Sequence, residues 1–318
     1  MSDQPIKILT VTSIYPTEED PGLGAFVASQ VRSLQKLDHQ VDVLFLDVRR
    51  SKWELLKGIG RVRDCVATNA YDLIHVHFGY NGVSACLQSR IPVVISFCGT
   101  DINHPKLLPI SRWAARRADA CIVKTEALLQ RLKHPAEIIP NGVDMDLFQP
   151  ISKDDARHQL GLSTDRKYAL FISNPDRPEK RFGLAQQAVK TVRGKGCPTE
   201  LIALHNRPQQ ELPLYFNAAD CLILSSSREG SPNTVKEAMA CNLPIVSTDV
   251  GDVRNIIEGT RHCAVCQADP NALSTGLLNA LQAQTPSDGR SRIAHLSAES
   301  VAARVVKVYH RVLEGRQS

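Results

Sequence analysis

Short apolar runs rich in β-branched residues alternate with helical patterns along most of the chain. A first series reads KILTVTS, VDVLFLD, DLIHVHF, PVVISFC and CIVKT, and a second reads YALFIS, ELIALH, CLILSSS, PIVSTD and CAVCQ. Strands that are apolar on both faces are typical of parallel sheets with helices on both sides. The sequence therefore predicts an α/β protein with two doubly wound parallel sheets.

The chain length and the segment at 140–154 predict two domains. At 318 residues, the chain is about twice the size of a common single domain. The segment PNGVDMDLFQPISKD is rich in turn residues and lacks periodicity, so we place the boundary near residue 145. This gives Rossmann-like domains at 1–145 and 146–297, and a last helix at 298–318 that can return to the first domain. Such sheets bind ligands at the carboxyl ends of their strands, and we expect the domains to face each other across a cleft there.

The composition is that of an ordinary globular protein. Hydrophobic residues make up 43% of the chain and charged residues 22%, and no apolar run approaches the roughly 20 residues that span a bilayer. The first residues lack the basic and apolar regions of a secretory signal. The nine cysteines lie mostly in apolar strands and helices, which indicates reduced thiols in a cytoplasmic protein.

Several ligand classes are not favoured by the motifs. Cys263 and Cys266 form a CxxC without a second pair at zinc-site spacing, so we expect no metal. No GxGxxG follows the first strand and no P-loop pattern occurs, which argues against nicotinamide, flavin and P-loop chemistry. Basic residues do not alternate with aromatic residues along one face, so we expect no nucleic acid partner.

Residues 49–63 form the most basic part of the chain. They contain six Lys or Arg and one Glu, an excess equal to the formal charge of +5 of the whole chain. Apolar residues between Leu55 and Val66 recur at helical spacing, which predicts an amphipathic surface helix. One interpretation is a solvated helix packed on its domain. The other, helped by Trp53, is a patch for anionic lipid or an anionic acceptor, which would make the protein peripheral at the inner membrane face.

The segment at 221–257 combines a buried strand, the polar loop REGSPN and a helix start. Ser231 is a suitable N-cap and Pro232 a suitable first helical residue. The free N–H groups and positive dipole end of such a helix start bind phosphate. Glu229 and Glu237 suit hydroxyl groups of a ribose or a sugar ring instead. The predicted phosphate-side residues are Gly230, Ser231, Pro232, Asn233, Thr234 and Val235.

This segment resembles the donor signature of the family 4 retaining glycosyltransferases, which have the two-domain GT-B fold. The family carries E-x7-E followed by A-M-A-x-x-x-P-V-V. This chain has Glu229, seven residues, Glu237, and then Ala238–Ala240 and Pro244–Val246. The resemblance implies that Glu229 contacts the transferred sugar and Glu237 the ribose of a UDP- or GDP-sugar. It also implies a donor-binding second domain, an acceptor-side first domain and retention of the anomeric configuration.

Other segments follow the family in order and spacing. The run PEKR contains Lys180, which by resemblance reaches the distal donor phosphate and offsets leaving-group charge. An arginine that the family has about five residues earlier is Pro175 here, and Arg177, or Asn174 from a shifted loop, is the candidate replacement. Two further departures are Asn242, where the family has glycine, and a connection after ELIALHN that is shorter by about one βα unit, near the expected base site.

The predicted acceptor side follows the strands of the first domain. A glycine-containing loop opens the helix after the first strand, where the family's glycine-rich loop faces donor phosphates and acceptor. Cys98 stands where family members often have a histidine near the reacting sugar. The alternative is that the histidine and lysine candidates are satisfied core groups and that Asp101 is a loop cap. The candidates are Gly22, Gly24 (toward the donor), His77, Cys98, Gly99, Thr100, Asp101 and Lys124.

We therefore expect a glycosyltransferase that works without metal or cofactor. It would move a sugar from a nucleoside-diphosphate sugar to a hydroxyl of a glycan, lipid-linked or small-molecule acceptor. Catalysis would rest on positioning and leaving-group stabilisation by Glu229, Lys180, Arg177 and Asp101. Two alternatives stay open: a nucleotide-sugar epimerase of the same fold, and a non-catalytic partner that binds sugar nucleotides or glycans.

Overall fold

The chain forms two compact units in a computed structural model that describes residues 4–51, 53–88 and 90–316. The first unit comprises the chain up to Pro16, Gly24–Gly142 and the chain from Ala298. The second comprises Thr17–Leu23 and Val143–Ser297. The chain therefore passes between the units close to residue 145, and its last helix belongs to the first unit. The short segment Thr17–Leu23 groups with the second unit, although the sequence-based division placed it in the first.

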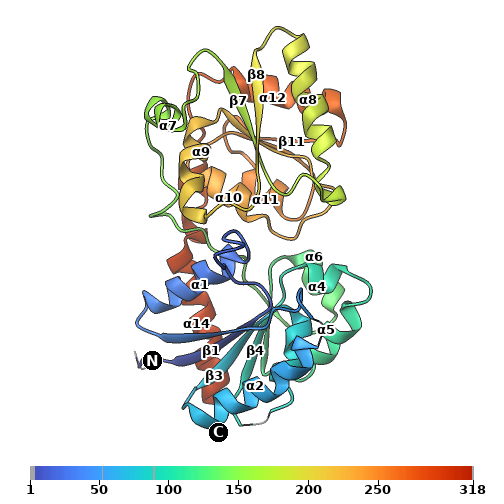
Figure 1. Ribbon diagram of the computed structural model, residues 1–318, viewed down its shortest axis with the longest axis vertical. Helices are drawn as coiled ribbons and strands as arrows, with labels where there is room; N and C mark the ends of the chain where they lie inside the picture. The colour runs from blue at the N-terminus through green and yellow to red at the C-terminus, as the bar shows by residue number, and fades with distance from the viewer. Residues whose placement is uncertain (1–3, 52, 89, 317–318) are drawn as a thin grey trace. The chain divides into compact units, whose positions relative to one another are not determined.

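Six parallel strands form the sheet of the first unit, in the order β2-β1-β3-β4-β5-β6 (Figure 1). The strands are β1 Lys7–Thr12, β2 Gln40–Phe45, β3 Leu73–His77, β4 Val93–Ser96, β5 Ala120–Val123 and β6 Glu137–Ile138. One face is covered by α1 Ala25–Gln35 and α14 Ala298–Gly315. The other is covered by α2 Glu54–Thr68, α3 Gly82–Ala85, α5 Leu108–Ala115 and α6 Glu126–Leu132. The short helices η1 Gly79–Asn81 and α4 Thr100–Asn103 follow β3 and β4.

The side chains of each strand alternate between the two faces of this sheet, and those of central strands such as β1 and β3 are buried on both faces. Ile8 packs with the α1 and α14 side, where it meets residues such as Val305. Its neighbour Leu9 packs on the opposite side with residues of α2, including Val62. This double burial explains why the strands read as continuous apolar runs in the sequence.

Five parallel strands form the sheet of the second unit, in the order β11-β10-β9-β7-β8. The strands are β7 Lys167–Ile172, β8 Thr199–Leu204, β9 Cys221–Leu224, β10 Ile245–Thr248 and β11 Ala264–Cys266. One face carries α8 Phe182–Gly194 and α12 Pro270–Leu281, and the other α9 Leu212–Ala218, α10 Asn233–Ala240 and α11 Val253–Ile257. The remaining helices are α7 Lys153–Leu160, η2 Pro178–Lys180, η3 Gln209–Glu211, α13 Gly289–Arg292 and η4 Ala294–Leu296.

The predicted doubly wound α/β fold is confirmed in both units. All ten predicted strands occur, with ends that shift by a few residues. The strand β6 was not predicted. It has two half-buried residues at the sheet edge, which is too short to produce a pattern in the sequence.

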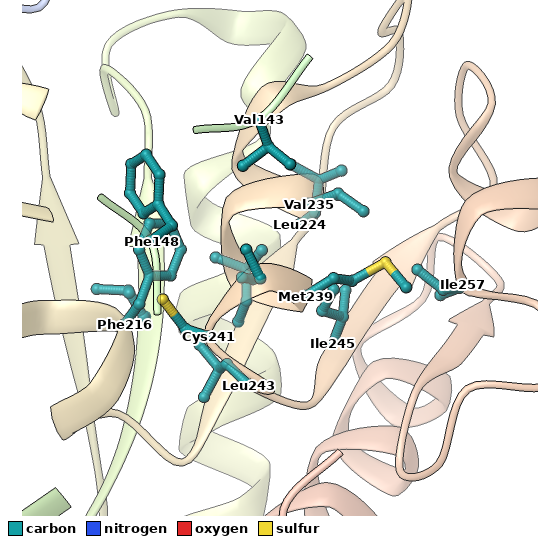
Figure 2. Packing of buried hydrophobic residues seen from close by; sticks show 14 of the residues in the cluster. Val143, Phe148, Phe216, Leu224, Val235, Met239, Cys241, Leu243, Ile245 and Ile257 are labelled. Atoms are coloured by element: carbon teal, nitrogen blue, oxygen red, sulfur yellow. The ribbon is translucent and has the colours of Figure 1, made fainter. Parts of the chain in front are cut away.

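The core beneath α10 fixes this helix on the sheet. Figure 2 shows Val235 and Met239 of α10 pointing into the cluster that contains Leu224 of β9 and Ile245 of β10. All four side chains are buried. A helix seated through its apolar face on two strands presents its first turn at a fixed place beyond the end of β9.

The C-terminus of α10 explains one departure from the family pattern. Asn242 has a left-handed backbone with φ 56°. Its N–H donates to Met239 O at 2.9 Å, and Leu243 N–H donates to Ala238 O at 2.9 Å, which is a Schellman motif. Asn242 Oδ1 also accepts from Arg290 N–H at 2.9 Å. Asparagine tolerates this conformation better than most residues, so it can stand where the family has glycine.

We predict that Asn242→Ala lowers the free energy of unfolding by about 1–3 kcal/mol, because a left-handed backbone is strained and the bond to Arg290 is lost. Asn242→Gly keeps the backbone freedom and should cost less. Urea unfolding of both variants measures the difference. Equal losses for alanine and glycine would contradict the role of the left-handed turn.

Candidate functional site

The start of α10 lies beyond the end of β9, as predicted, but its cap differs from the prediction. Helix α10 begins at Asn233, so Pro232 is not the first helical residue. Pro232 occupies the cap position with an extended backbone (φ −69°, ψ 121°), and Ser231 precedes it. Among the described residues, no N–H of the first turn of α10 donates to the side chain of its cap residue. The amides of Thr234 and Val235 thus belong to an uncapped helix start, which is the arrangement that suits an anion.

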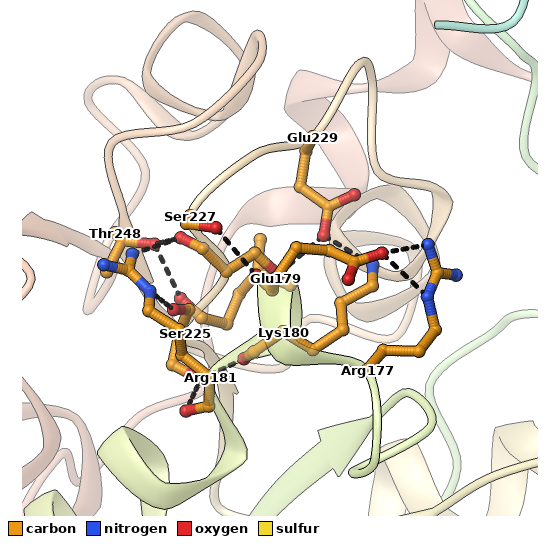
Figure 3. A network of polar contacts seen from close by, with 10 residues as sticks. Arg177, Glu179, Lys180, Arg181, Ser225, Ser227, Glu229 and Thr248 are labelled. Carbon is orange, nitrogen blue, oxygen red and sulfur yellow. Dashed lines mark hydrogen bonds and ion pairs between the residues drawn. The ribbon is translucent and has the colours of Figure 1, made fainter. Parts of the chain in front are cut away.

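Lys180 and Glu229 form an ion pair (Figure 3), and Glu229 lies in the loop that leads into α10. Lys180 Nζ donates to Glu229 Oε1 at 2.7 Å, and Ser226 Oγ donates to the same oxygen at 2.6 Å. Both charged side chains are largely but not fully buried, with 15% and 13% of their surface exposed. The structure therefore brings together two predicted site residues that are far apart in the sequence.

Arg181, which was not predicted as a site residue, holds the backbone around this pair. Its backbone is left-handed (φ 47°), and its guanidinium donates to the carbonyl oxygens of Ser225 (2.8 Å) and Ser226. Ser225 Oγ donates back to Lys180 O at 2.9 Å, and Thr248 Oγ1 donates to Ser226 O at 2.6 Å. This network ties η2 to the end of β9 and so fixes the origin of the Lys180 side chain. Only its place next to Lys180 in the PEKR run pointed to Arg181.

Arg177 lies at the edge of the network and pairs with Glu179. Its Nε donates to Glu179 Oε1 at 2.8 Å, and 55% of its side chain is exposed. Bonding to its own amide and then to Arg177 holds the pKa of Glu179 below its usual range. Arg177 thus contacts a surface carboxylate rather than Glu229, and its predicted catalytic role has no direct support from this geometry.

Glu237 lies on the second turn of α10 and is buried, with 7% of the residue exposed. Burial raises the pKa of this carboxyl to about 7, while Gln209 and Lys236 act in the opposite direction. Gln209 Nε2 donates to Glu237 Oε1 at 3.3 Å. A buried carboxylate with one amide donor can still accept bonds from hydroxyl groups. Gln209 was missed by sequence reasoning because it carries no motif.

The predicted glycines are explained first by backbone geometry. Gly24 is left-handed (φ 64°), and an added Cβ would lie 2.6 Å from Ile14 O. The N–H of Gly22 donates to Asn206 Oδ1 at 3.3 Å within the second unit. Gly230 O is approached closely by Gly251, where an added Cβ would lie 2.2 Å away. Their ligand contacts stay predictions.

In the first unit, Asp101 joins the loops that follow β3 and β4. Its Oδ1 accepts from the N–H groups of Cys98 (3.1 Å) and Gly99 (2.9 Å), and Oδ2 accepts from Gly79 N–H (2.7 Å). The residue is fully buried, and burial raises its pKa although these amides oppose the shift. Asp101 is therefore the loop cap that the sequence left open as an alternative, and its catalytic role stays a prediction. Thr100, the first residue of α4, remains exposed.

Two predicted residues lie at strand ends in the same unit, His77 on β3 and Lys124 after β5, and β4 lies between these two strands. His77 is buried, and its ring lies 4.6 Å from that of His75, which is satisfied by Ser96 Oγ (2.8 Å) and by the Tyr309 hydroxyl (2.6 Å). His77 Nδ1 has no hydrogen-bond partner among the described residues. Burial lowers the pKa of Lys124, and the nearby Cys98 and Asp101 oppose this shift.

The basic segment at 49–63 forms most of α2, and its predicted amphipathic helix is confirmed. Val62 and Val66 are buried toward the sheet, whereas Trp53 and Leu56 are 69% and 51% exposed. Lys52 lies outside the described residues. No helix in the described ranges is long and apolar enough to cross a membrane.

Two doubly wound parallel sheets with polar residues at their strand ends define the class of the chain as the GT-B fold. Solved structures share it over nearly the whole chain. Sucrose-phosphate synthase from Thermosynechococcus elongatus has a TM-score of 0.75 at 17% identity, covering 97% of this chain and 100% of that one. HepE from Anabaena in complex with UDP has a TM-score of 0.67 at 16% identity, covering 96% and 100%. At such low identity the likeness shows the fold.

Sequence comparison shows that the chain is similar to glycosyltransferases. The family model "Glycosyl transferases group 1" matches residues 176–283, and "Glycosyltransferase Family 4" matches 22–147. A putative teichuronic acid biosynthesis glycosyltransferase, TuaC of Bacillus subtilis, is 27% identical over 86% of this chain and 88% of that protein. A D-inositol 3-phosphate glycosyltransferase of Thermobispora bispora is 25% identical over 81% and 75%. The second half of the chain is thus similar to group 1 glycosyltransferases and the first half to family 4 glycosyltransferases, which supports glycosyltransferase activity.

The buried histidines should make stability depend on pH. Burial lowers the pKa of His75 to about 3 and that of His77 well below its usual value of 6.5. The unfolded chain binds protons below about pH 6.5 that the folded chain does not, so stability falls as the pH drops through this range. Between pH 7 and pH 5, each histidine should lower the free energy of unfolding by about 2 kcal/mol.

Urea unfolding of the wild type and of His77→Gln at both pH values checks this expectation. The variant should lose less stability on acidification, whatever its stability at pH 7. An identical loss in both proteins would show that His77 is protonated in the folded state.

Proposed function

We propose that this chain transfers a sugar, with retention, from a nucleoside-diphosphate sugar to an acceptor hydroxyl. The observation that carries the proposal is the Lys180–Glu229 pair, whose Glu229 lies in the loop that leads into the uncapped start of α10. The HepE structures hold UDP, UDP with glucose, and UDP-glucose, which supports a UDP-sugar as donor, with GDP-sugar as the other candidate. The names of TuaC and of the inositol phosphate enzymes favour a glycan or small-molecule acceptor.

The positive groups of the site suit the diphosphate of such a donor, and its carboxylate suits the sugar. The diphosphate is anionic, so it suits the amides of Thr234 and Val235 and the ammonium of Lys180. Glu229 repels phosphate but accepts bonds from sugar hydroxyls, and its bond to Lys180 holds the ammonium next to the sugar. As the bond between sugar and diphosphate breaks, negative charge grows on the leaving phosphate, and a fixed ammonium lowers the barrier.

Glu237 completes the donor site on the ribose side. It lies on the same helix as the amides proposed to bind phosphate, and it is buried with Gln209 and Lys236 nearby. A carboxylate there accepts bonds from two ribose hydroxyls and leaves the choice of base to other residues. In this proposal no side chain forms a covalent bond to the sugar, and no metal takes part.

The test is incubation with labelled UDP- and GDP-sugars, with and without glycan or glycolipid extracts. Label in a glycan or lipid supports transfer. A changed free donor without any acceptor would indicate an epimerase, and binding without turnover would indicate a non-catalytic partner; either result contradicts the proposal.

We predict that Lys180→Met lowers kcat about 100- to 1,000-fold, because it removes a charge that stabilises the transition state. The KM for the donor should change much less. Steady-state kinetics measures both, with the exposed Lys190→Met on α8 as the matched control. A rise in KM alone would assign Lys180 to ground-state binding and contradict its role toward the leaving group.

We also propose a peripheral contact with anionic membrane through the basic segment 49–63. Trp53 and Leu56 are exposed, and the cations Arg50, Lys57 and Arg61 keep 74%, 67% and 45% of their side chains exposed. Ion pairs with Asp47 and Glu54 reduce the net positive charge, so the apolar pair must contribute to binding.

Flotation with phosphatidylcholine vesicles, with or without phosphatidylglycerol, tests this contact. The wild type should float only with the anionic vesicles. The double variant Trp53→Ser/Leu56→Ser should not float with either kind of vesicle. Ile151→Ser, at an exposed apolar residue of the second unit, is the control. Flotation that ignores lipid charge would contradict the proposal.

A further inference from the structure

The short connection between β8 and α9 places an amide side chain against the ribose-side carboxylate. After β8 ends at Leu204, the chain reaches η3 within a few residues and continues directly into α9. Gln209 is the first residue of η3 and is 8% exposed, and Glu237 on α10 is 7% exposed. Their side chains meet through the bond from Gln209 Nε2 to Glu237 Oε1 at 3.3 Å.

We propose that Gln209 is a positioning residue for donor binding, which favours the ionised form of Glu237 and holds it in one orientation to accept hydrogen bonds from the ribose of a nucleoside diphosphate. This inference rests on the proposed function, because it assumes that Glu237 contacts the ribose. It adds a residue that the donor signature does not contain, in the segment where this chain is shorter than its family.

The need for such a residue follows from the surroundings of Glu237. Burial is the largest influence on this carboxyl, and its pKa is about 7 with the opposing effects of Gln209 and Lys236 included, so loss of Gln209 would leave most of it protonated at neutral pH. Gln209 opposes this from η3, and Lys236 opposes it from the same helix. Cys241, also on this side of α10, is a thiol whose own pKa is raised to about 12, so it brings no charge. Arg290 faces Cys241 and lowers that thiol's pKa.

The protonation state of Glu237 matters for a hydroxyl ligand. An ionised carboxylate only accepts hydrogen bonds, whereas a protonated carboxyl must use one oxygen as a donor. Two neighbouring ribose hydroxyls that both donate therefore need the ionised form. A glutamine amide that donates to one oxygen stabilises this form and leaves other lone pairs of the carboxylate for the ribose.

The connection that carries Gln209 is itself fixed at both ends. Asn206 is left-handed (φ 52°), and its side chain accepts from Gly22 N–H and donates to Glu19 O at 3.4 Å. On the other side, α9 begins at Leu212, with a proline in its first turn. A segment held in this way can place an amide group with little conformational freedom.

The experiment is calorimetric titration of the wild type, Gln209→Leu and Gln210→Leu with UDP and GDP from pH 6 to pH 9. Gln210 lies in the same short helix but is exposed, so its variant is the matched control. The affinity of the wild type for the nucleotide should fall as the pH drops through the pKa of Glu237, which is about 7. In Gln209→Leu the midpoint should move up by about one pH unit, so affinity falls about fivefold at pH 7 and recovers at pH 9.

The outcomes separate the two proposals. A purely structural role of Gln209 would lower affinity equally at every pH, and an unshifted midpoint would show no influence on Glu237; either result overturns the inference alone. A wild type that binds neither UDP nor GDP, or Glu237→Gln with unchanged affinity, would contradict the proposed function itself.

Discussion

Burial of the central strands on two faces is the constraint on which the rest of this structure depends. When both faces of a sheet carry helices, a polar side chain within a strand has no access to water and needs an internal partner. His75 shows this rule, because Ser96 and Tyr309 satisfy both of its ring nitrogens. Charged groups therefore collect where strands end, and parallel strands end on the same edge. The site residues of each unit lie at such an edge for this reason.

At these edges the backbone is held by side chains that do not themselves fit a ligand. Arg181 binds the carbonyls at the end of β9, and Asp101 binds three amides between the loops after β3 and β4. Both are charged groups used as anchors, each satisfied by backbone partners. The proposed reactive groups Lys180 and Glu229 are by contrast paired with each other and partly exposed. The difference between anchor and ligand group is therefore one of exposure and partners, not of residue type.

This difference also explains what the sequence could and could not predict. The strands followed from their apolar runs, and Glu229 and Glu237 from a spacing that fixes both on one loop and helix. The cap of α10 was misplaced because Ser231 and Pro232 both have strong positional preferences, and only the backbone angles decide between them. Asp101 follows a strand end, as a catalytic carboxylate in such a fold would. Its three amide partners come from two separate loops, so the sequence could not show that it caps them. Gln209 lies outside any motif, and the PEKR run that contains Arg181 does not indicate its role, since both roles arise from contacts between distant segments.

The central claim is that the first turn of α10 binds the diphosphate of a nucleotide. The most direct measurement is the amide chemical shifts of the protein during titration with UDP and with GDP. The amides of Thr234 and Val235 should shift with one of the two, while Ala272 should not, because Asp269 caps its helix. Unchanged shifts at Thr234 and Val235 with saturating nucleotide would contradict the account.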